Sequence, residues 1–167
     1  MKTVIAPIIA FLLAACAYNS QQRQTTENMV GLWEERSPTM NAITLRNGDG
    51  TYRRKQIQTY DLAKPPLAYE SAGHWGVSGK QYIFDLEYVS TPIWKKDVGK
   101  QWKVTILESN QELLKYLSTD GATVEERKIG EASTAAFDKS AVRPLAKGSQ
   151  SMFWRGKERD RSDRDKK

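Results

Sequence analysis

The stretch QYIFDLEYVS, residues 81–90, has the clearest alternation of apolar and polar side chains in the sequence. Successive side chains of a β-strand point to opposite faces, so this spacing predicts a strand with one buried face. The side chains expected to share that buried face are Tyr82, Phe84, Leu86 and Tyr88.

Seven further runs between residues 29 and 130 have a similar aromatic and β-branched character. The eight predicted strands are, in chain order, 29–36, 42–47, 51–60, 69–77, 81–90, 101–109, 112–118 and 122–129. Tight turns such as Asn47–Gly50 and Asp120-Gly121 join several of them, and such turns connect neighbouring antiparallel strands. The pattern predicts an all-β domain, an eight-stranded antiparallel up-and-down β-barrel, with a two-sheet sandwich as the alternative.

The third run, TYRRKQIQTY (residues 51–60), is more polar than the others. One of its faces carries Arg54, Gln56 and Gln58 together with Tyr52. A strand of this kind either lines a wet cavity or ends the sheet. An eight-stranded barrel has an interior that side chains can fill or that can hold one small ligand.

The first fifteen residues, MKTVIAPIIAFLLAA, place one cation before an apolar run, which is typical of a secretory signal peptide. The run is too short for a membrane-spanning helix. Leu13–Cys16 (LAAC) resembles the lipobox of bacterial lipoproteins. The resemblance implies cleavage before Cys16, the only cysteine of the chain, and transfer of a diacylglycerol to its sulfur. A plain secretory peptide is the alternative.

Two or more acyl chains, palmitate among them, would give stable anchoring at about 0.8 kcal/mol per buried methylene. The small residue after the cysteine, Ala17, implies the outer membrane facing the periplasm by the same resemblance. The domain prediction is therefore a signal peptide (1–15), a lipidated cysteine with a polar, flexible linker (16–28), a barrel (29–130) and a disordered basic tail (131–167). The formal net charge of +6 owes much to that tail.

Four segments together resemble bacterial lipocalin-like domains. They are VGLW (30–33), NGDGTY (47–52), HWGVSGKQY (74–82) and VTILESNQEL (104–113). The resemblance implies that Trp33, two residues after Gly31, plugs the closed end of the barrel under a cation from the final strand, for which Arg127 or Lys128 is the candidate. The alternative is that Trp33 is only a core residue.

Connections in an up-and-down barrel alternate between its two ends. The short turns therefore fall at the end of Trp33, and the longer connections 37–40, 61–68 and 91–100 gather at the other end, the candidate mouth. The ligand-binding residues predicted there are Met40, Tyr60, Pro65, Leu67, Tyr88, Trp94, Lys95 and Lys96. In the last loop, Trp94 and the two lysines could gate a cavity, hold an anionic ligand or contact lipid headgroups, and packing at the barrel end is the alternative.

Catalytic chemistry is not expected. His74, the only histidine, alternates with Trp75 and is predicted to face solvent, and no nucleophile, metal-ligand set or phosphate-binding loop accompanies it. We predict a non-enzymatic protein without cofactor or metal and with no nucleic-acid partner.

Two functions remain at this stage: binding of a small apolar or amphipathic ligand, or a protein-interaction or inhibitor module that engages an envelope protein and has a solid interior. A cavity of at least ~300 Å³ would distinguish the first from the second.

Overall fold

The computed structural model describes residues 20–59 and 64–145. The signal peptide, Cys16, Tyr60 and residues 146–167 lie outside the described residues. The strands are β1 (Gly31–Arg36), β2 (Met40–Arg46), β3 (Thr51–Gln58), β4 (Leu67–Ser78), β5 (Gln81–Asp85), β6 (Tyr88–Val89), β7 (Gln101–Ser109), β8 (Leu113–Leu117) and β9 (Thr123–Gly130). A 3₁₀ helix, η1 (Pro92–Asp97), and an α-helix, α2 (Thr134–Lys139), follow β6 and β9, and residues 20–29 are helical. Among the described residues, no helix has the length and apolar character needed to cross a bilayer.

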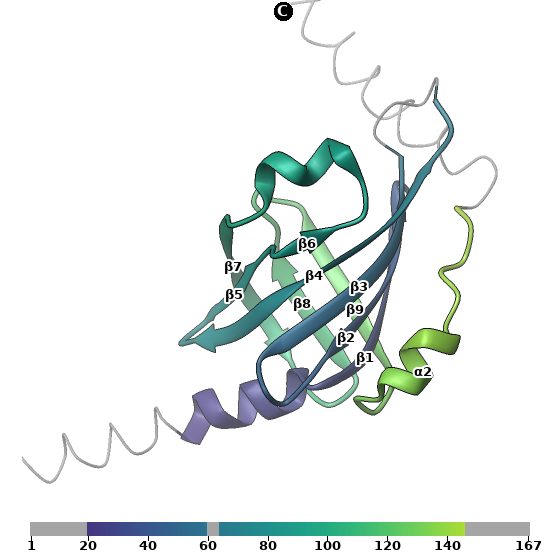
Figure 1. The fold of residues 1–167 in the computed structure, drawn as a ribbon. Helices are drawn as coiled ribbons and strands as arrows, with labels where there is room; N and C mark the ends of the chain where they lie inside the picture. The colour runs from purple at the N-terminus through teal and green to yellow at the C-terminus, as the bar shows by residue number, and fades with distance from the viewer. Residues whose placement is uncertain (1–19, 60–63, 146–167) are drawn as a thin grey trace, which may run out of the picture.

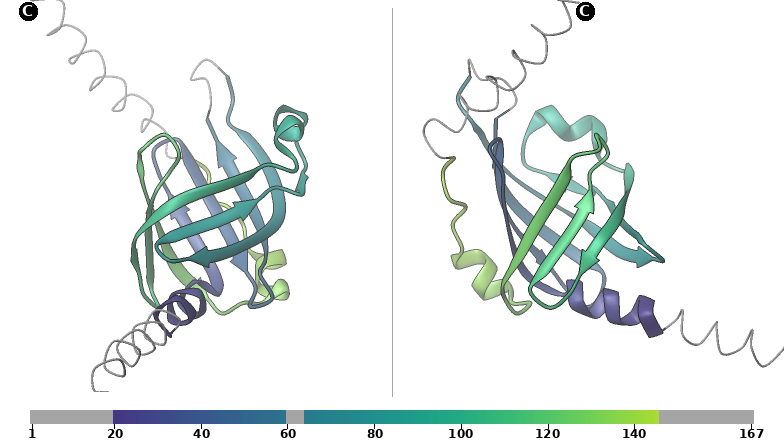
Figure 2. Two further views of the ribbon diagram at one scale, coloured as in Figure 1. Left: turned by 90° about the vertical axis from the view of Figure 1, so that its left-hand side faces the viewer. Right: turned by 180° about the vertical axis from the view of Figure 1, so that it is seen from behind.

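The sheet closes on itself. The strands follow the order β3-β2-β1-β9-β8-β7-β5-β4, and β3 pairs with β4 to complete a ring of eight strands (Figures 1 and 2). Every pairing is antiparallel, and the short β6 pairs only with β4. This is the closed eight-stranded up-and-down β-barrel that the sequence predicted, and closure removes the exposed strand edges that a sandwich would leave.

Inward-facing side chains form one core across the barrel. The pairing sets Trp33 opposite Thr44, Arg46 opposite Tyr52, and Tyr82 opposite Val104, all of which are buried. The buried apolar cluster of the interior comprises Met29, Trp33, Tyr52, Trp75, Tyr82, Val104, Ile106, Leu114 and Tyr116. Tyr82, which belongs to the stretch with the clearest alternation, is therefore central to the core.

The prediction for Tyr88 was wrong because the strand contains a bulge. Trp75 lies opposite Phe84, whereas Ala72 lies opposite Tyr88, so β5 and β6 together have one more residue than the facing part of β4. This extra residue reverses the alternation. Tyr88 is 54% exposed on the outside, and Val89 is buried in its place. Gly73 permits the bulge, because a Cβ there would collide with the carbonyl oxygen of Asp85.

The polar, flexible linker predicted before the barrel is wrong for residues 20–28, which belong to a helix at the closed end (Figure 1). The Gln22 side chain donates a hydrogen bond to the Val77 carbonyl at 2.9 Å. The Met29 side chain is fully buried, and its carbonyl accepts the indole N–H of Trp33 at 2.9 Å. Because one apolar side chain anchors an otherwise polar helix, the sequence shows no apolar stripe that would predict it.

The predicted disordered tail is also wrong for residues 131–145. The helix α2 is capped by the Ser133 hydroxyl, which accepts from the Ala136 N–H at 3.2 Å. Its Phe137 side chain is fully buried on the outside of the barrel. Its neighbours in that outer cluster are Leu32, Ile43 and Leu45 of β1 and β2. The helix is short and has one large apolar residue, so its stability comes from this contact rather than from its own propensity.

Candidate ligand-binding cavity

The mouth half of the barrel contains a cavity of about 350 Å³. Its lining includes Met40 at the start of β2, Gln58 at the end of β3, Trp94 of η1 and Thr119 after β8. The start of β2 and the end of β3 lie at the end of the barrel opposite the N-terminal helix (Figure 1), which is the predicted mouth. The walls consist of two chemically different flanks, one aromatic and one polar.

The aromatic flank comes mainly from β5, β7, β8 and η1. The Phe84 and Trp102 rings are stacked, with centroids 5.5 Å apart and planes at 18°. The centroid of the Tyr82 ring lies 5.2 Å from that of Phe84 and 5.7 Å from that of Tyr116, to which it is edge-on. The apolar side chains of this flank are Tyr82, Phe84, Trp94, Trp102, Val104 and Tyr116.

The polar flank comes from β2, β3 and β4. The Gln56 amide donates to the Gln58 side-chain oxygen at 3.0 Å and also to the Tyr69 hydroxyl. The Arg54 Nε donates to the Gln56 side-chain oxygen at 2.9 Å. The inward side chains of this flank are Thr44, Arg54, Gln56, Gln58, Tyr69 and Ser71. The third run was predicted either to line a wet cavity or to end the sheet: β3 lines a cavity, and it does not end the sheet because it pairs with β4.

A buried ion pair lies beneath the cavity, in contact with the lining residues Tyr82 and Tyr116, and is called the floor below. Arg46 Nη1 lies 2.7 Å from Glu126 Oε2, and Nη2 donates to Oε1 at 3.0 Å. Neither side chain is exposed to solvent. The Tyr116 hydroxyl donates to Glu126 Oε1 at 3.1 Å, and Arg46 Nε donates to the Tyr82 hydroxyl at 3.2 Å. The pair, which joins β2 to β9, is thus also hydrogen-bonded to Tyr116 of β8 and Tyr82 of β5.

The cation at the closed end is Arg46 of β2, so the prediction of a cation from the final strand was wrong. The Arg46 guanidinium lies 6.0 Å from the centre of the Trp33 ring, which is fully buried. Arg127 points outward and pairs with Glu125 at 2.7 Å on the surface. Lys128 lies next to Gly31, whose positive φ of 144° favours glycine.

A second ion pair joins the floor to the polar flank. Arg54 Nη2 lies 2.5 Å from Glu35 Oε2, and Nη1 donates to the Thr44 hydroxyl at 3.0 Å. Glu35 lies opposite Glu126 in the β1–β9 pairing. Arg54 Nη1 lies 3.5 Å from Glu126, so the two carboxylates and two guanidiniums form one buried network.

The two carboxylates of this network differ in acidity. Burial raises the pKa of Glu35 above its ordinary value, and the Arg54 guanidinium offsets only part of that effect. Burial also acts to raise the pKa of Glu126, but Arg46 and Arg54 together outweigh it and hold this pKa below its ordinary value. Burial raises the pKa of both Tyr82 and Tyr116, so their hydroxyls stay neutral.

Of the predicted mouth residues, Met40 and Trp94 line the cavity. Pro65, Lys95 and Lys96 are exposed and Leu67 is half-buried, and none of these four is among the lining residues of the described chain. Sequence analysis missed the network of Arg46, Glu126 and Glu35. The available signal was the position of Arg46 on the inward-facing register of an apolar strand, where a cation requires a buried partner.

His74 lies on the outer face, and the prediction that it faces solvent is confirmed. Its Nδ1 lies 3.1 Å from Glu87 and 3.8 Å from Asp85. The ligand atoms of these three residues are close enough to one another to reach one metal ion. Sequence spacing missed this arrangement because His74 is on β4, whereas Asp85 ends β5 and Glu87 follows it. The cluster lies outside the cavity and takes no part in it.

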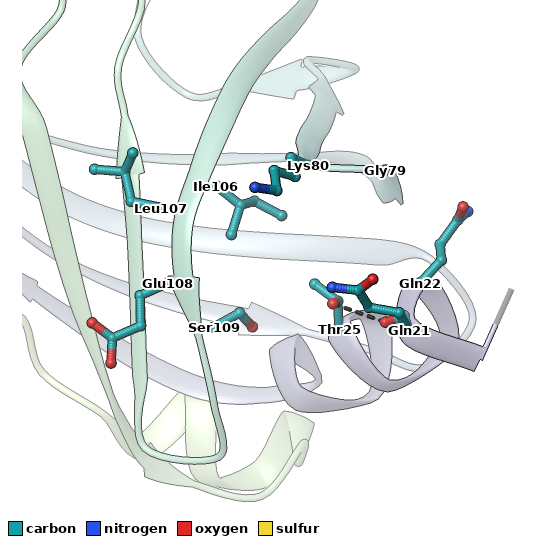
Figure 3. Close-up of a pocket in the computed structure, with 9 residues that line it drawn as sticks. All are labelled: Gln21, Gln22, Thr25, Gly79, Lys80, Ile106, Leu107, Glu108 and Ser109. Carbon is teal, nitrogen blue, oxygen red and sulfur yellow. Dashed lines mark hydrogen bonds between the residues drawn. The ribbon is translucent and has the colours of Figure 1, made fainter. Parts of the chain in front are cut away.

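A second hollow, of about 340 Å³, lies outside the barrel between the N-terminal helix and β7 (Figure 3). The helix contributes Gln21, Gln22 and Thr25, and the strand side includes Ile106 and Ser109. It is lined largely by polar side chains at the surface. Ligand sites are typically apolar enclosures with a few polar groups, which favours the interior cavity as the candidate site.

No family model matches the chain, and no curated protein matches it. Among the solved structures that match is a lipocalin-like protein from Bacteroides uniformis, with 12% identity over 61% of this chain and 99% of that one and a TM-score of 0.41. The assignment of a closed eight-stranded up-and-down barrel rests on the strand pairing itself.

Proposed function

We propose that this protein is an envelope-anchored lipoprotein whose lipocalin-like barrel binds a small apolar or amphipathic ligand. The observation that supports the proposal is the cavity of about 350 Å³ enclosed by aromatic and hydrogen-bonding side chains. Ligand sites have volumes of about 300 Å³ or more, and a close-packed interior has few voids larger than a water molecule. The cavity thus counts against the alternative of a solid protein-interaction module.

The proposal is for a binding protein and not an enzyme. The described cavity offers tyrosine, amide and paired guanidinium groups, and its walls bring no activated nucleophile next to a base. Such groups orient a ligand and exclude water from it. The expected activity is reversible binding.

The anchor in this proposal is the lipid on Cys16, at the outer membrane. Four peptide steps separate Cys16 from residue 20, a span of at most ~14 Å. Residue 20 belongs to the helix at the closed end (Figure 1). An anchor at this position would hold the closed end towards the membrane and direct the mouth, with Trp94 and its lysines, away from it. The loop would then meet ligand or an envelope partner rather than the headgroups of the anchoring membrane.

The ligand test uses the chain from residue 17 onwards, exported behind a signal peptide without a lipobox, and recovered from its own envelope without detergent. Native mass spectrometry should show a noncovalent small molecule that leaves on unfolding. Ser71→Trp would fill the cavity from β4, because Ser71 is buried and lines it. Glu70→Trp, on the exposed side of the same strand, is the matched control.

We expect the small molecule to be lost in the Ser71 variant and retained in the Glu70 variant. Recovery of an empty barrel in every case would contradict ligand binding and favour the protein-interaction alternative.

The anchor test is separate. Cys16→Ser should abolish metabolic labelling with palmitate and either release the protein from the membrane fraction or stop its processing, because a hydroxyl does not replace the thiolate as the nucleophile. Unchanged membrane attachment of this variant would refute the lipidation proposal.

A further inference from the structure

The ionised side chains in the described lining of the cavity are already paired with groups of opposite charge. Arg54 uses its three nitrogens on Gln56, Thr44 and Glu35 at 2.9, 3.0 and 2.5 Å. At the mouth, the buried Asp97 lies 2.5 Å from Lys100 Nζ. Neither lining charge is left to attract a charged ligand.

The floor beneath is neutral for the same reason. Arg46 binds both oxygens of Glu126. With Arg54 and Glu35, the network contains two cations and two anions, whose charges balance. The lysines of η1, Lys95 and Lys96, are exposed and lie outside the described lining.

We infer that the cavity selects uncharged ligands with an apolar part and at least one hydrogen-bonding group. This inference rests on the proposed function and specifies its ligand class. A charged group carried into the cavity would lose its hydration without gaining a free counter-ion, which costs binding free energy. A carboxylate or ammonium ligand would first have to displace a partner from an existing buried ion pair.

The two flanks support a ligand with one apolar and one polar side. Phe84 and Trp102, whose rings stack on each other, belong to the apolar wall. The other flank contributes the side chains of Gln56, Tyr69 and Ser71. A molecule between them would bury its apolar part against the rings and place its polar group towards the amides and hydroxyls.

A matched pair of fluorescent probes tests the inference directly. N-phenyl-1-naphthylamine is uncharged, and 8-anilino-1-naphthalenesulfonate has the same ring system with one added sulfonate. The protein used is residues 16–167 with Cys16→Ser, which keeps every residue that the structure describes. Affinities are measured by fluorescence titration and by calorimetry, and Ser71→Trp must remove the signal if it arises from the cavity.

We expect the uncharged probe to bind at least about tenfold more tightly than the sulfonate. Equal or tighter binding of the sulfonate within the cavity would overturn the inference while leaving ligand binding intact. Absence of cavity binding by both probes would overturn the inference together with the proposed function.

A pair of carboxylate variants tests the cause of the selectivity. Glu35→Gln removes the anion that neutralises Arg54 and should reduce the preference for the uncharged probe about tenfold. Glu34→Gln changes the adjacent carboxylate on the outer face, which pairs with Arg36, and should leave the preference unchanged. If the Glu35 variant folds and keeps the original preference for the uncharged probe, charge pairing is not the cause of that preference. The comparison of the two probes on the unmodified protein tests the selectivity itself and does not depend on this variant.

Discussion

The two ends of the barrel are built from the same strands but differ in packing: the closed end is filled by side chains, and the mouth contains a cavity. At the closed end Trp33, Arg46 and Met29 have no exposed surface, and a helix covers them. At the mouth, Met40 and Gln58 on β2 and β3 remain partly exposed around a cavity. The closed end is filled by side chains that satisfy one another, whereas the mouth leaves surface that a ligand can cover. Substitutions at the closed end should therefore change mainly stability, and substitutions at the mouth should change mainly ligand binding.

The largest effect is expected at the floor. Glu126→Gln leaves the buried Arg46 without its counter-ion and should lower the free energy of unfolding by about 3–5 kcal/mol. Glu125→Gln, on the exposed face of the same strand, should change it by less than about 0.5 kcal/mol. Urea denaturation measures both. A Glu126 variant as stable as its Glu125 control would show that the floor does not hold the barrel together.

The second-largest effect on stability is expected from α2, which packs on the outer face of β1 and β2. Phe137→Ala removes the one buried side chain by which α2 packs on β1 and β2 and should cost about 3 kcal/mol. Hydrogen exchange should show loss of protection in α2, while the probe affinity of the mouth stays within a factor of about two. Lys139→Ala is the control from the same helix. Loss of mouth binding together with α2 would mean that the two ends are coupled.

The pH dependence of stability that arises from the buried carboxylates should be smaller than the effects of these substitutions. It should have two opposing contributions, one from Glu126 and one from Glu35. The pKa of Glu126 is lowered from 4.5, so its contribution to stability is present above pH 4.5 and is lost as the pH falls through its folded value. The pKa of Glu35 is raised from 4.5, so stability increases as the pH falls through its folded value towards 4.5. Each contribution changes by at most about 1.4 kcal/mol per pH unit.

Urea unfolding between pH 3 and pH 7 tests these signs. The advantage of the unmodified protein over Glu126→Gln should shrink below pH 4.5, and its advantage over Glu35→Gln should grow as the pH falls to 4.5. The reverse order would mean that Glu35, and not Glu126, is the carboxylate stabilised as an anion.

The smallest effect concerns the helical cover. Gln22→Ala removes the hydrogen bond to the Val77 carbonyl and should cost about 1 kcal/mol. Exchange of the amides in residues 20–29 should become faster, with mouth binding unchanged. Gln24→Ala, an exposed position of the same helix, is the control and should match the unmodified protein.

The barrel could be predicted from the sequence because the signals of its strands and turns are local and repeated. Alternation in the stretch around Tyr82 and the tight turns fixed strand order, and strand order fixed which connections meet at the mouth. The site itself was harder to predict. Trp94 and Met40 line the cavity as expected, but Tyr88 does not, because one bulge residue beside Gly73 reverses the alternation.

The sequence by itself determined an all-β chain whose apolar faces must meet, because period-two alternation leaves each strand with one face to bury. Only the tertiary structure decided which cation lies over Trp33, since Arg46 and Glu126 are far apart in the chain and meet only when β2 and β9 flank β1. The same holds for the N-terminal helix at the closed end and for α2 on the outer face of β1 and β2, each held by one buried apolar residue. Contacts between distant residues supply the free energy that local propensity lacks, so they become visible only after the barrel has closed.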